Sequence, residues 1–486
     1  GISGIVAAYT LKDKGHDVVV FERGRRVQFG DVPPGEEFDD EIGGKCYTKY
    51  FHDQAYELGA CSVSPGFKTV LKHARRTGAR VRNRFPFGVL QSDGTMQTTR
   101  QAYWPRGAGF RIMREVFRYW RHTISFKIRY DKGSTYAPMP EMYTVPFMEF
   151  CRRQKMQYVP RFMELPVVSF GYGALEDIRT WYVLDYINAI NWPGLALLLM
   201  GLNQVPVKRL DRGYEDLVQR IAEGMDVRHH HEVVDVLRHE PGVTVKVKDL
   251  DTGDMSEETF DKIVIAAPLT DVKDILDRSE EEAGLLDSPV RAGTDAHHLQ
   301  PDEAEVVAGT KIKPYVVVAA EIDGLPEGKA LLLRENVGEQ GHVMLIERTM
   351  VAEASALSVC YIPDGAAPAG ETQEATRART LKQLEEDVAV FGGTLGTIHA
   401  YKRWNYFPHF VDSGLYRKLA QIQGRRDTYY VGGLTKFELA ERCAAQAEFL
   451  MDYSFDGEMT RECFTSLRNW FYFYARALPR PAPKRG

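Results

Sequence analysis

Two glycines at the start of the chain have the spacing of a phosphate-binding turn. Gly1 and Gly4 begin an alanine-rich run with helical periodicity, and an apolar run at residues 18–21 ends at Glu22. Glycine lets backbone N–H groups approach a pyrophosphate at the start of a helix, where the helix dipole favours negative charge. Glu22, about twenty residues further on, is placed to accept hydrogen bonds from ribose hydroxyls. The stretch is therefore interpreted as most of a dinucleotide-binding βαβ unit.

The unit is incomplete at its N-terminal side. A full motif has a strand and one more glycine before Gly1, and the sequence contains neither. We therefore expect that an N-terminal part is missing from the sequence. A protein that truly began at Gly1 would be expected to bind the dinucleotide weakly.

Two further pairs of glycines suit a close approach to phosphate. Gly43 and Gly44 are followed by Lys45, whose charge could contact a phosphate, although an ordinary turn explains the same residues. Gly432 and Gly433 follow a strand-like run and precede a predicted helix. That order is again typical of a phosphate site.

The histidines and cysteines give weaker evidence for a catalytic or metal-binding site. Three adjacent histidines, residues 229–231, are expected on a strand, where neighbouring side chains alternate between faces and cannot converge on one metal ion. His409 could act as an acid or base, and the alternative is a structural hydrogen bond at a strand end. The six cysteines show no metal-like spacing, so we predict free thiols and no metal site. No motif marks a Ser-His-Asp set or a carboxylate pair.

Helical and strand patterns alternate along the chain and would hold these residues in place. Helices are expected at residues 66–76, 108–126, 213–224, 374–391 and 437–451. Strands are expected at residues 232–237, 243–247, 262–268, 314–322, 330–333, 342–346, 357–361, 397–404 and 428–431, with a hairpin at 85–96. Aromatic and basic residues interleave at residues 108–126; an amphipathic helix with a solvated basic face explains them better than nucleic-acid binding does.

Three segments have unusual composition. Residues 145–202 are rich in aromatic residues and methionine, which fits either a helical cap over an apolar ligand or plain core. Residues 277–305 are acidic and are expected to form a surface insertion or a mobile loop. The C-terminal tail has a predicted helix at 461–478 with aromatic residues at 470–474, which either pack on the protein itself or form a docking surface.

Length and composition narrow the class of protein. A chain of 486 residues is too long for one core, and 44% apolar with 27% charged residues is typical of a soluble globular enzyme. The net charge of −5 gives no reason to expect nucleic-acid binding. No apolar run approaches the roughly 20 residues of a membrane-spanning helix. Scattered cysteines favour a reducing compartment, such as the cytoplasm or an organelle interior, although any targeting segment would precede Gly1.

Several motifs together resemble a known family. They run in order through most of residues 1–453 and read GGKCYT (43–48), YELGA (56–60), RRTG (75–78), VPFMEF (145–150), FGYG (170–173), YVLDY (182–186), NYFPH (405–409) and QGRRDTYYVGG (423–433). With the three glycine sites, they resemble the FAD-dependent amine-oxidoreductase superfamily. Within it they are most similar to the bacterial polyenoic fatty acid isomerases.

The resemblance implies a mixed α/β fold with a Rossmann-like FAD-binding domain, a discontinuous substrate domain and a helical cap. The implied parts are FAD-binding (1–100, 211–270 and 401–453), helical cap (101–210), substrate domain (271–400, with the insertion 277–305) and a C-terminal helix and tail (454–486). The residues implied to hold FAD are Gly1, Gly4, Glu22, Gly43, Gly44, Lys45, Gly432 and Gly433. The family usually has an acid where this chain has Gly433, which removes one side-chain contact. For Lys45 we prefer a phosphate contact to one with the flavin.

The resemblance also implies a reaction. Oxidised FAD would take a hydride from the methylene between two double bonds of a polyunsaturated chain and return it at another carbon, giving a conjugated diene with no net oxidation. The implied substrate residues are Phe87, Arg84, Phe170, Leu195 and Tyr406. Phe87 stands where the isomerases have an arginine for the carboxylate, so Arg84 or Arg82 would have to replace it, or the substrate differs.

Two other functions stay open at this point. The same fold serves net oxidases and desaturases that pass electrons to oxygen or a quinone. A non-catalytic assembly subunit could also keep the fold and dock through its aromatic C-terminal helix. The expected partners are a small apolar substrate such as a fatty acid or other lipid, no nucleic acid, and a peripheral membrane or protein contact through that C-terminal helix.

Overall fold

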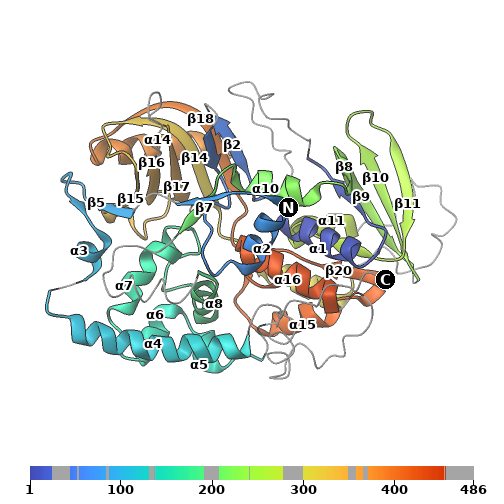
Figure 1. Cartoon of the computed structure of the whole chain (residues 1–486), viewed down its shortest axis with the longest axis horizontal. Helices are drawn as coiled ribbons and strands as arrows, with labels where there is room; N and C mark the ends of the chain where they lie inside the picture. The colour runs from blue at the N-terminus through green and yellow to red at the C-terminus, as the bar shows by residue number, and fades with distance from the viewer. Residues whose placement is uncertain are drawn as a thin grey trace, which may run out of the picture.

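The computed structural model describes residues 1–24, 44–51, 54–83, 87–104, 106–130, 136, 138–190, 207–239, 241–276, 299–348, 357–364, 370–453 and 455. Among them are helices together with parallel and antiparallel strand pairs, as expected for a mixed α/β protein (Figure 1). Figure 1 shows the largest sheet at upper left, a layer of helices below it and a second α/β part on the right.

The second α/β part is assembled from segments far apart in the sequence. Its strands form parallel pairs, β1 (Val19–Glu22) with β8 (Asp226–His229) and β12 (Ile263–Ile265) with β20 (Thr428–Tyr430). Its helices are α1 (Ile2–Asp13), α2 (Lys68–Thr77), α10 (Gly213–Ala222) and α16 (Ala440–Tyr453), and their apolar residues share one buried cluster. Parallel strands joined through helices are the architecture of a dinucleotide-binding fold.

The largest sheet in the described part of the chain has seven strands in the order β18-β14-β17-β16-β15-β5-β6. These are β18 (Thr394–Trp404), β14 (Tyr315–Asp323), β17 (Leu357–Pro363), β16 (Leu345–Arg348), β15 (Lys329–Leu333), β5 (Phe87–Leu90) and β6 (Met96–Gln97). Every neighbouring pair is antiparallel except β15 with β5. Strands at or near the expected 314–322, 330–333, 342–346, 357–361 and 397–404, and the hairpin expected at 85–96, thus lie in one sheet.

Both faces of this sheet are buried, which explains the continuous apolar run in β14. Val316 and Val318 pack on one face, in a cluster with Leu384 and Val388 of α14 (Gln373–Val390). Tyr315 and Val317 alternate with them and belong to a different cluster on the other face.

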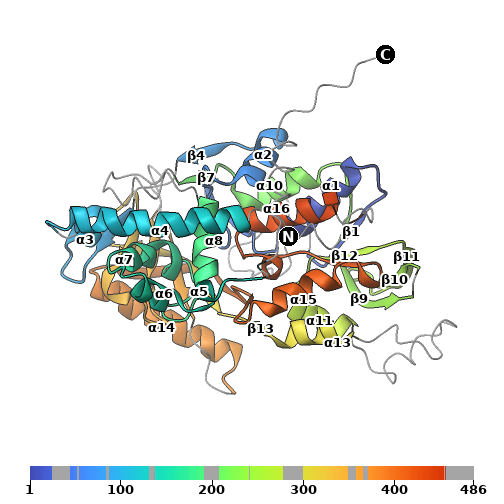
Figure 2. The same cartoon turned by 90° about the horizontal axis from the view of Figure 1, so that it is seen from below.

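A layer of helices lies below the sheet. It comprises α3 (Thr99–Tyr103), α4 (Gly109–Arg129), α5 (Glu141–Thr144), α6 (Phe147–Arg153), α7 (Val159–Met163), a π-helical turn η1 (Glu164–Val168) and α8 (Thr180–Ile190). Figure 2 looks onto this layer from below, with α4 in front. The helical character of the described part of the aromatic block at 145–202 is confirmed.

A smaller antiparallel sheet, β9 (His231–Arg238), β10 (Val243–Asp249) and β11 (Met255–Phe260), lies beside the second α/β part. Around it are α11 (Leu269–Leu276), α13 (Pro301–Ala308) and α15 (Gly414–Ile422). Short pairs are β2 (Thr48–Phe51) with β3 (Gln54–Glu57), β4 (Val81–Asn83) with β7 (Lys208–Leu210), and β13 (Thr310–Lys311) with β19 (His409–Phe410). The remaining elements are the 3-10 turns η4 (Arg334–Asn336), η5 (Arg425–Asp427) and η6 (Gly433–Thr435).

Three expectations about elements were wrong. The histidines 229–231 do not share a strand, because His230 has a positive φ of 59° and separates β8 from β9. The acidic stretch 277–305 is not all surface: Glu303 in α13 is buried and paired with Arg238 at 2.7 Å, while residues 277–298 lie outside the described residues. The last helix begins at Ala440 rather than at residue 437, because η6 comes first.

Free cysteines agree with the sequence: Cys46, Cys61, Cys151, Cys360 and Cys443 form no disulfide in the described structure. In the same part of the chain, no cluster of three or more His, Cys, Asp or Glu side chains has the geometry of a metal site. Nor does any described helix combine the length and apolar character needed to cross a bilayer.

Candidate functional site

One cavity of about 2470 Å³ is lined by the second α/β part, the largest sheet and the helical layer. Pockets for one small ligand usually measure about 300–1,000 Å³, so this cavity has room for a large cofactor and a second molecule. We name two groups of lining residues. The glycine end comprises Gly1, Gly4, Glu22, Gly44, Gly432 and Gly433, and the aromatic end comprises Phe87, Phe170, Tyr172, Tyr186, Tyr315, Tyr361 and Tyr406.

At the glycine end, the start of α1 meets the turn at Gly44. Gly1 caps the helix and its carbonyl accepts the Ile5 N–H at 3.2 Å. Gly44 has φ of 56°, and a Cβ on it would lie 3.5 Å from the Gly1 Cα. A side chain at Gly44 would therefore occupy space in which a phosphate could reach backbone N–H groups. The positive end of the α1 dipole points at the same space.

Gly4 allows α1 to lie directly against the strand edge. A Cβ on Gly4 would lie only 2.8 Å from the Cβ of Ala266, just after β12. Real Cβ atoms do not approach so closely, and neither group can rotate away. The glycine is therefore required by close helix–strand packing, the role that the third glycine has in dinucleotide-binding motifs.

Glu22 lies at the end of β1 and lines the cavity, as the sequence predicts. Its Oε1 accepts the Gly24 N–H at 3.1 Å, and its Oε2 lies 3.8 Å from the Gly1 nitrogen. The carboxylate is thus held beside the start of α1, with about a quarter of its side chain exposed to accept further hydrogen bonds.

Gly432 and Gly433 approach the cavity from the C-terminal part of the chain. The Val431 N–H donates to the Ile265 carbonyl at 2.9 Å, which extends the β12–β20 pairing as far as the glycines. Gly432 then takes a φ of 142°, which side-chain-bearing residues rarely adopt. Gly433 begins the turn η6, which precedes α16, so these glycines line the cavity without beginning the last helix.

Lys45 makes a contact that the sequence did not indicate. Its ammonium group donates to Glu438 and, at 2.7 Å, to the Asn405 carbonyl, and it lies 5.8 Å from the centre of the Tyr406 ring. Burial raises the pKa of Glu438, and the charge of Lys45 opposes that rise. A phosphate contact by Lys45 stays a prediction. Since Glu438 is nearly 400 residues away in the sequence, no local pattern could have revealed the pair.

The aromatic end is built by side chains from separate elements. Tyr315 of β14 lies 5.5 Å from Tyr406, and Tyr406 lies 5.5 Å from Tyr172, measured between ring centres. Phe170 lies 6.4 Å from Tyr361 of β17. Phe87 in β5 and Tyr186 in α8 complete the group. Aliphatic side chains continue this lining at Leu165, Ile187 and Ile190.

The FGYG motif has a steric role in this wall. Gly171 has φ of 80°, and a Cβ on it would collide with the ring of Tyr315. The Tyr315 hydroxyl donates to the carbonyl of Ser169, so the turn is fixed against the ring face. Glycine at this position therefore places Phe170 and Tyr172 at the cavity wall.

The tyrosines of the wall are neutral at physiological pH. Burial raises the pKa of Tyr172, Tyr315 and Tyr406 well above the ordinary value of a phenol. Together with phenylalanine and aliphatic side chains, they make a surface that suits an apolar ligand and excludes water.

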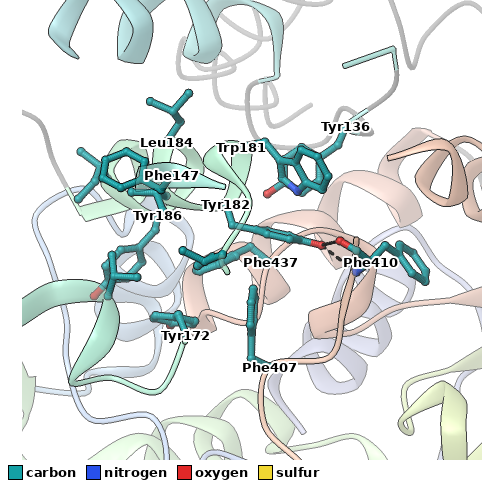
Figure 3. Close-up of a cluster of buried hydrophobic side chains, with 14 of the residues drawn as sticks. Tyr136, Phe147, Tyr172, Trp181, Tyr182, Leu184, Tyr186, Phe407, Phe410 and Phe437 are labelled. Carbon is teal, nitrogen blue, oxygen red and sulfur yellow. Dashed lines mark hydrogen bonds between the residues drawn. The ribbon is translucent and has the colours of Figure 1, made fainter. Parts of the chain in front are cut away.

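A second layer of aromatic residues supports this wall (Figure 3). Tyr182 of α8 donates to the Phe410 carbonyl at 3.0 Å and accepts the Phe410 N–H at 2.9 Å, which fixes α8 to β19. Phe407 and Phe437 lie between Tyr182 and Tyr172. In the YVLDY motif, Tyr182 thus supports the wall, while Tyr186 lines the cavity.

His409 belongs to this supporting layer and does not line the cavity as the structure describes it. Its Nδ1–H donates to the Phe407 carbonyl at 2.7 Å, and its ring stacks on Phe407 at 4.6 Å. Burial lowers the pKa of His409 to about 4. The structure therefore shows the hydrogen bond to the Phe407 carbonyl, and a role of His409 as an acid or base stays a prediction.

The other predicted substrate residues divide into two sets. Phe87, Phe170 and Tyr406 line the cavity. Gly43, Arg84 and Leu195 lie outside the described residues and stay predictions. Arg82, a possible replacement for the missing arginine, forms an ion pair with Asp211 at 2.5 Å and is not among the described cavity residues.

Comparison with known proteins agrees with this architecture. Residues 37–293 match the family described as flavin containing amine oxidoreductase, and residues 1–32 match a NAD(P)-binding Rossmann-like domain. No curated protein matches the sequence as a whole.

Solved structures of similar fold include a CLA-producing fatty acid isomerase from P. acnes. It is 20% identical, with a TM-score of 0.73 over 94% of this chain and 97% of that one. Putrescine oxidase bound to putrescine is 16% identical, with a TM-score of 0.62 over 93% and 96% of the two chains. Cyclohexylamine oxidase from Brevibacterium oxydans is also 16% identical, with a TM-score of 0.61 over the same shares. These likenesses show the fold.

Proposed function

Since the chain belongs to the flavin-containing amine oxidoreductase family, in which FAD is the cofactor, we propose that it is a double-bond isomerase of polyunsaturated fatty acids or similar apolar chains. The family and the fold support an FAD-dependent enzyme of the oxidoreductase type. The observation that carries the finer proposal is the neutral, aromatic wall in a cavity that also contains the glycine end.

The glycine end fits FAD on structural grounds. A side chain at Gly44 would occupy space beside the α1 terminus, and the partly exposed Glu22 carboxylate would accept hydrogen bonds from ribose hydroxyls. In the proposal, Gly1, Gly4, Glu22, Gly44, Gly432 and Gly433 hold FAD, with Gly43 and Lys45 as predicted additions. FAD, when bound, supplies an acceptor and donor of hydride, so the protein itself needs no nucleophile.

The aromatic end would bind the substrate chain and exclude water. Loss of a hydride leaves positive charge on the substrate carbons, and the faces of aromatic rings stabilise a cation. Neutral tyrosines serve this role better than ionised groups, which could trap the cation or admit water. Return of the hydride at another carbon restores the electron count, so the product is an isomer.

Recognition of a carboxylate is the least defined part of this proposal. Phe87 lines the cavity where the resembling isomerases have an arginine. The charge of Lys45 is already balanced by Glu438. The proposed substrate class therefore includes apolar chains without a free carboxylate, alongside fatty acids such as the substrate of the P. acnes isomerase.

An anaerobic spectrum of the FAD-loaded protein with linoleic acid tests the proposal. We expect ultraviolet absorbance of conjugated diene to exceed one equivalent per flavin while the flavin stays oxidised. Phe170→Leu should change the rate or the diene isomer several-fold with FAD still bound. Phe51→Leu is the matched control, because Phe51 is half-buried but lies outside the described cavity lining.

Other outcomes identify the alternatives. Bleaching of one equivalent of flavin without diene, reversed by air, would show an oxidase or desaturase. Failure to retain FAD would favour an assembly subunit. Retained FAD with neither signal would exclude linoleic acid and move attention to substrates that lack a carboxylate.

A further inference from the structure

The outer face of α4 exposes large apolar side chains. Phe110 is 83% exposed, Phe117 56%, Met113 45% and Ile128 44%. Only three other large apolar residues of the described chain are comparably exposed, and they are scattered: Met255, Val390 and Val411. Exposed apolar side chains are normal when they occur singly, whereas a group on one element marks an interaction surface.

These residues form a stripe along the helix. Phe110, Met113, Phe117 and Ile128 follow the helical repeat of three, four and eleven residues, so they project from one side. The opposite side is buried through Ile112, Val116, Tyr119, Thr123 and Phe126. The helix is therefore packed correctly on its inner side, and its apolar outer stripe is an additional feature. Figure 2 shows no described element in front of it.

Positive charge accompanies this stripe. The helix carries six basic residues: Arg111, Arg114, Arg118, Arg121, Lys127 and Arg129. Its one acid, Glu115, is buried and accepts the N–H groups of Gln157 and Tyr158 at 2.9 and 2.7 Å. No ion pair joins Arg111, Arg114 or Arg121 to a carboxylate in the described structure. The outer face of α4 is thus strongly basic, although the whole chain has a net charge of −5.

We propose that the outer face of α4 docks on a lipid bilayer whose surface carries anionic headgroups. An amphipathic helix with large apolar residues on one side and arginine or lysine beside them lies in the plane of a membrane interface. The 21 residues of α4 span about 30 Å, and in Figure 1 the helix lies along the lower left edge of the molecule. Anionic headgroups match the basic residues, and the acyl region matches the phenylalanines.

The position of α4 connects this surface to the cavity. The Asn188 side chain of α8 donates to the Thr123 carbonyl of α4 at 3.3 Å, and α4 also packs against α7. Ile187 and Ile190 of α8 line the cavity beside the aromatic end. Leu165 of η1, the π-helical turn that follows α7, lines it too. Docking would therefore bring the apolar part of the cavity to within one helical layer of the lipid. This advantage rests on the proposed function, whereas docking itself does not.

Vesicle flotation of the full FAD-loaded chain tests the proposal. We expect at least tenfold more binding to phosphatidylglycerol–phosphatidylcholine vesicles than to pure phosphatidylcholine, with a decrease at high salt. Phe110→Ser with Phe117→Ser should reduce binding at least tenfold, and Arg111→Gln with Arg114→Gln and Arg121→Gln should do the same. Val390→Ser is the matched control, because Val390 is 58% exposed on α14, and it should bind as the parent does.

Three results would overturn docking: no binding by the parent protein, unchanged binding by the phenylalanine variant, or an equal loss in the control. Sedimentation of the same proteins completes the test. A dimer that the phenylalanine variant dissociates, without vesicle binding by the parent, would show that α4 joins two copies. Since flotation needs no turnover, a wrong substrate assignment does not affect the result.

Discussion

The two ends of the cavity are built in different ways. At the glycine end, the close approach of α1 to the residue after β12 depends on the absence of a Cβ at Gly4. At the aromatic end, the walls are side chains contributed by a sheet, a helix and two loops. At Gly4 the first arrangement leaves no room for a side chain, whereas the second accepts exchange of one ring for another. A family can therefore keep its cofactor while it changes its substrate.

The largest effect on flavin binding is expected from Gly4→Val. The added Cβ must displace Ala266 or α1, and overpacking of this kind costs about 1–3 kcal/mol, or roughly 5- to 150-fold in an equilibrium constant. The variant should be purified with little or no flavin absorbance. Gly109→Val is the control, since Gly109 also begins a helix but has open space at its Cβ position. Full retention of FAD by Gly4→Val would contradict the claim that the glycine end has no room for a side chain at Gly4.

The next prediction concerns stability and the ion pair of Lys45 with the buried Glu438, two residues that line the same cavity. Lys45→Met removes the counter-charge of a buried carboxylate and should lower the free energy of unfolding by about 3 kcal/mol. Adding Glu438→Gln should recover most of that loss. Urea unfolding at pH 7 and fixed FAD concentration measures both.

The exposed pair Lys382–Glu386, with its partners 3.8 Å apart, is the control. Lys382→Met should change the unfolding free energy by less than about 1 kcal/mol. If Lys45→Met had an equally small effect, the cavity around Glu438 would be as wet as the protein surface.

The smallest effect is expected behind the aromatic end, at His409. Because the pKa of His409 is about 4 in the folded protein and about 6.5 when unfolded, the unfolded chain binds more protons between these values. Stability is therefore full above pH 6.5 and falls as the pH drops toward 4, by roughly 2 kcal/mol between pH 7 and pH 5.

In His409→Phe this share of the pH dependence should disappear, since phenylalanine keeps the stack on Phe407 and cannot titrate. Thermal unfolding from pH 5 to pH 7 measures it. Enzyme activity should be kept. Loss of activity with unchanged stability would show that His409 takes part in catalysis.

The two ends of the cavity also differ in how far their residues could be predicted from the sequence. Gly1, Gly4 and Glu22 lie within one βαβ unit, so their spacing alone predicts where they meet. Glu438 and Tyr315 reach the cavity through pairing of distant segments, and no local pattern encodes that. The sequence did mark the FGYG motif, but the reason for Gly171 appears only once the Tyr315 ring lies against it.

Errors arose where one residue interrupts a pattern. The positive φ of His230 breaks an apparent strand, and the turn η6 delays the last helix to Ala440. Glu303 resembles a solvated acid in a charged stretch until its partner Arg238 is seen. For Glu303, the contact that decides its burial comes from elsewhere in the chain.

The packing of α1 against α16 has a consequence for synthesis on the ribosome. More than 400 residues separate the two helices, and β20, which completes the parallel pairing with β12, also emerges late. At roughly 5–20 residues per second, the first helix waits for tens of seconds before its partner exists. During that time its apolar side is open to chaperones. Flavin capture is therefore a late event, and a nascent chain stalled before residue 428 would hold an unfinished dinucleotide site.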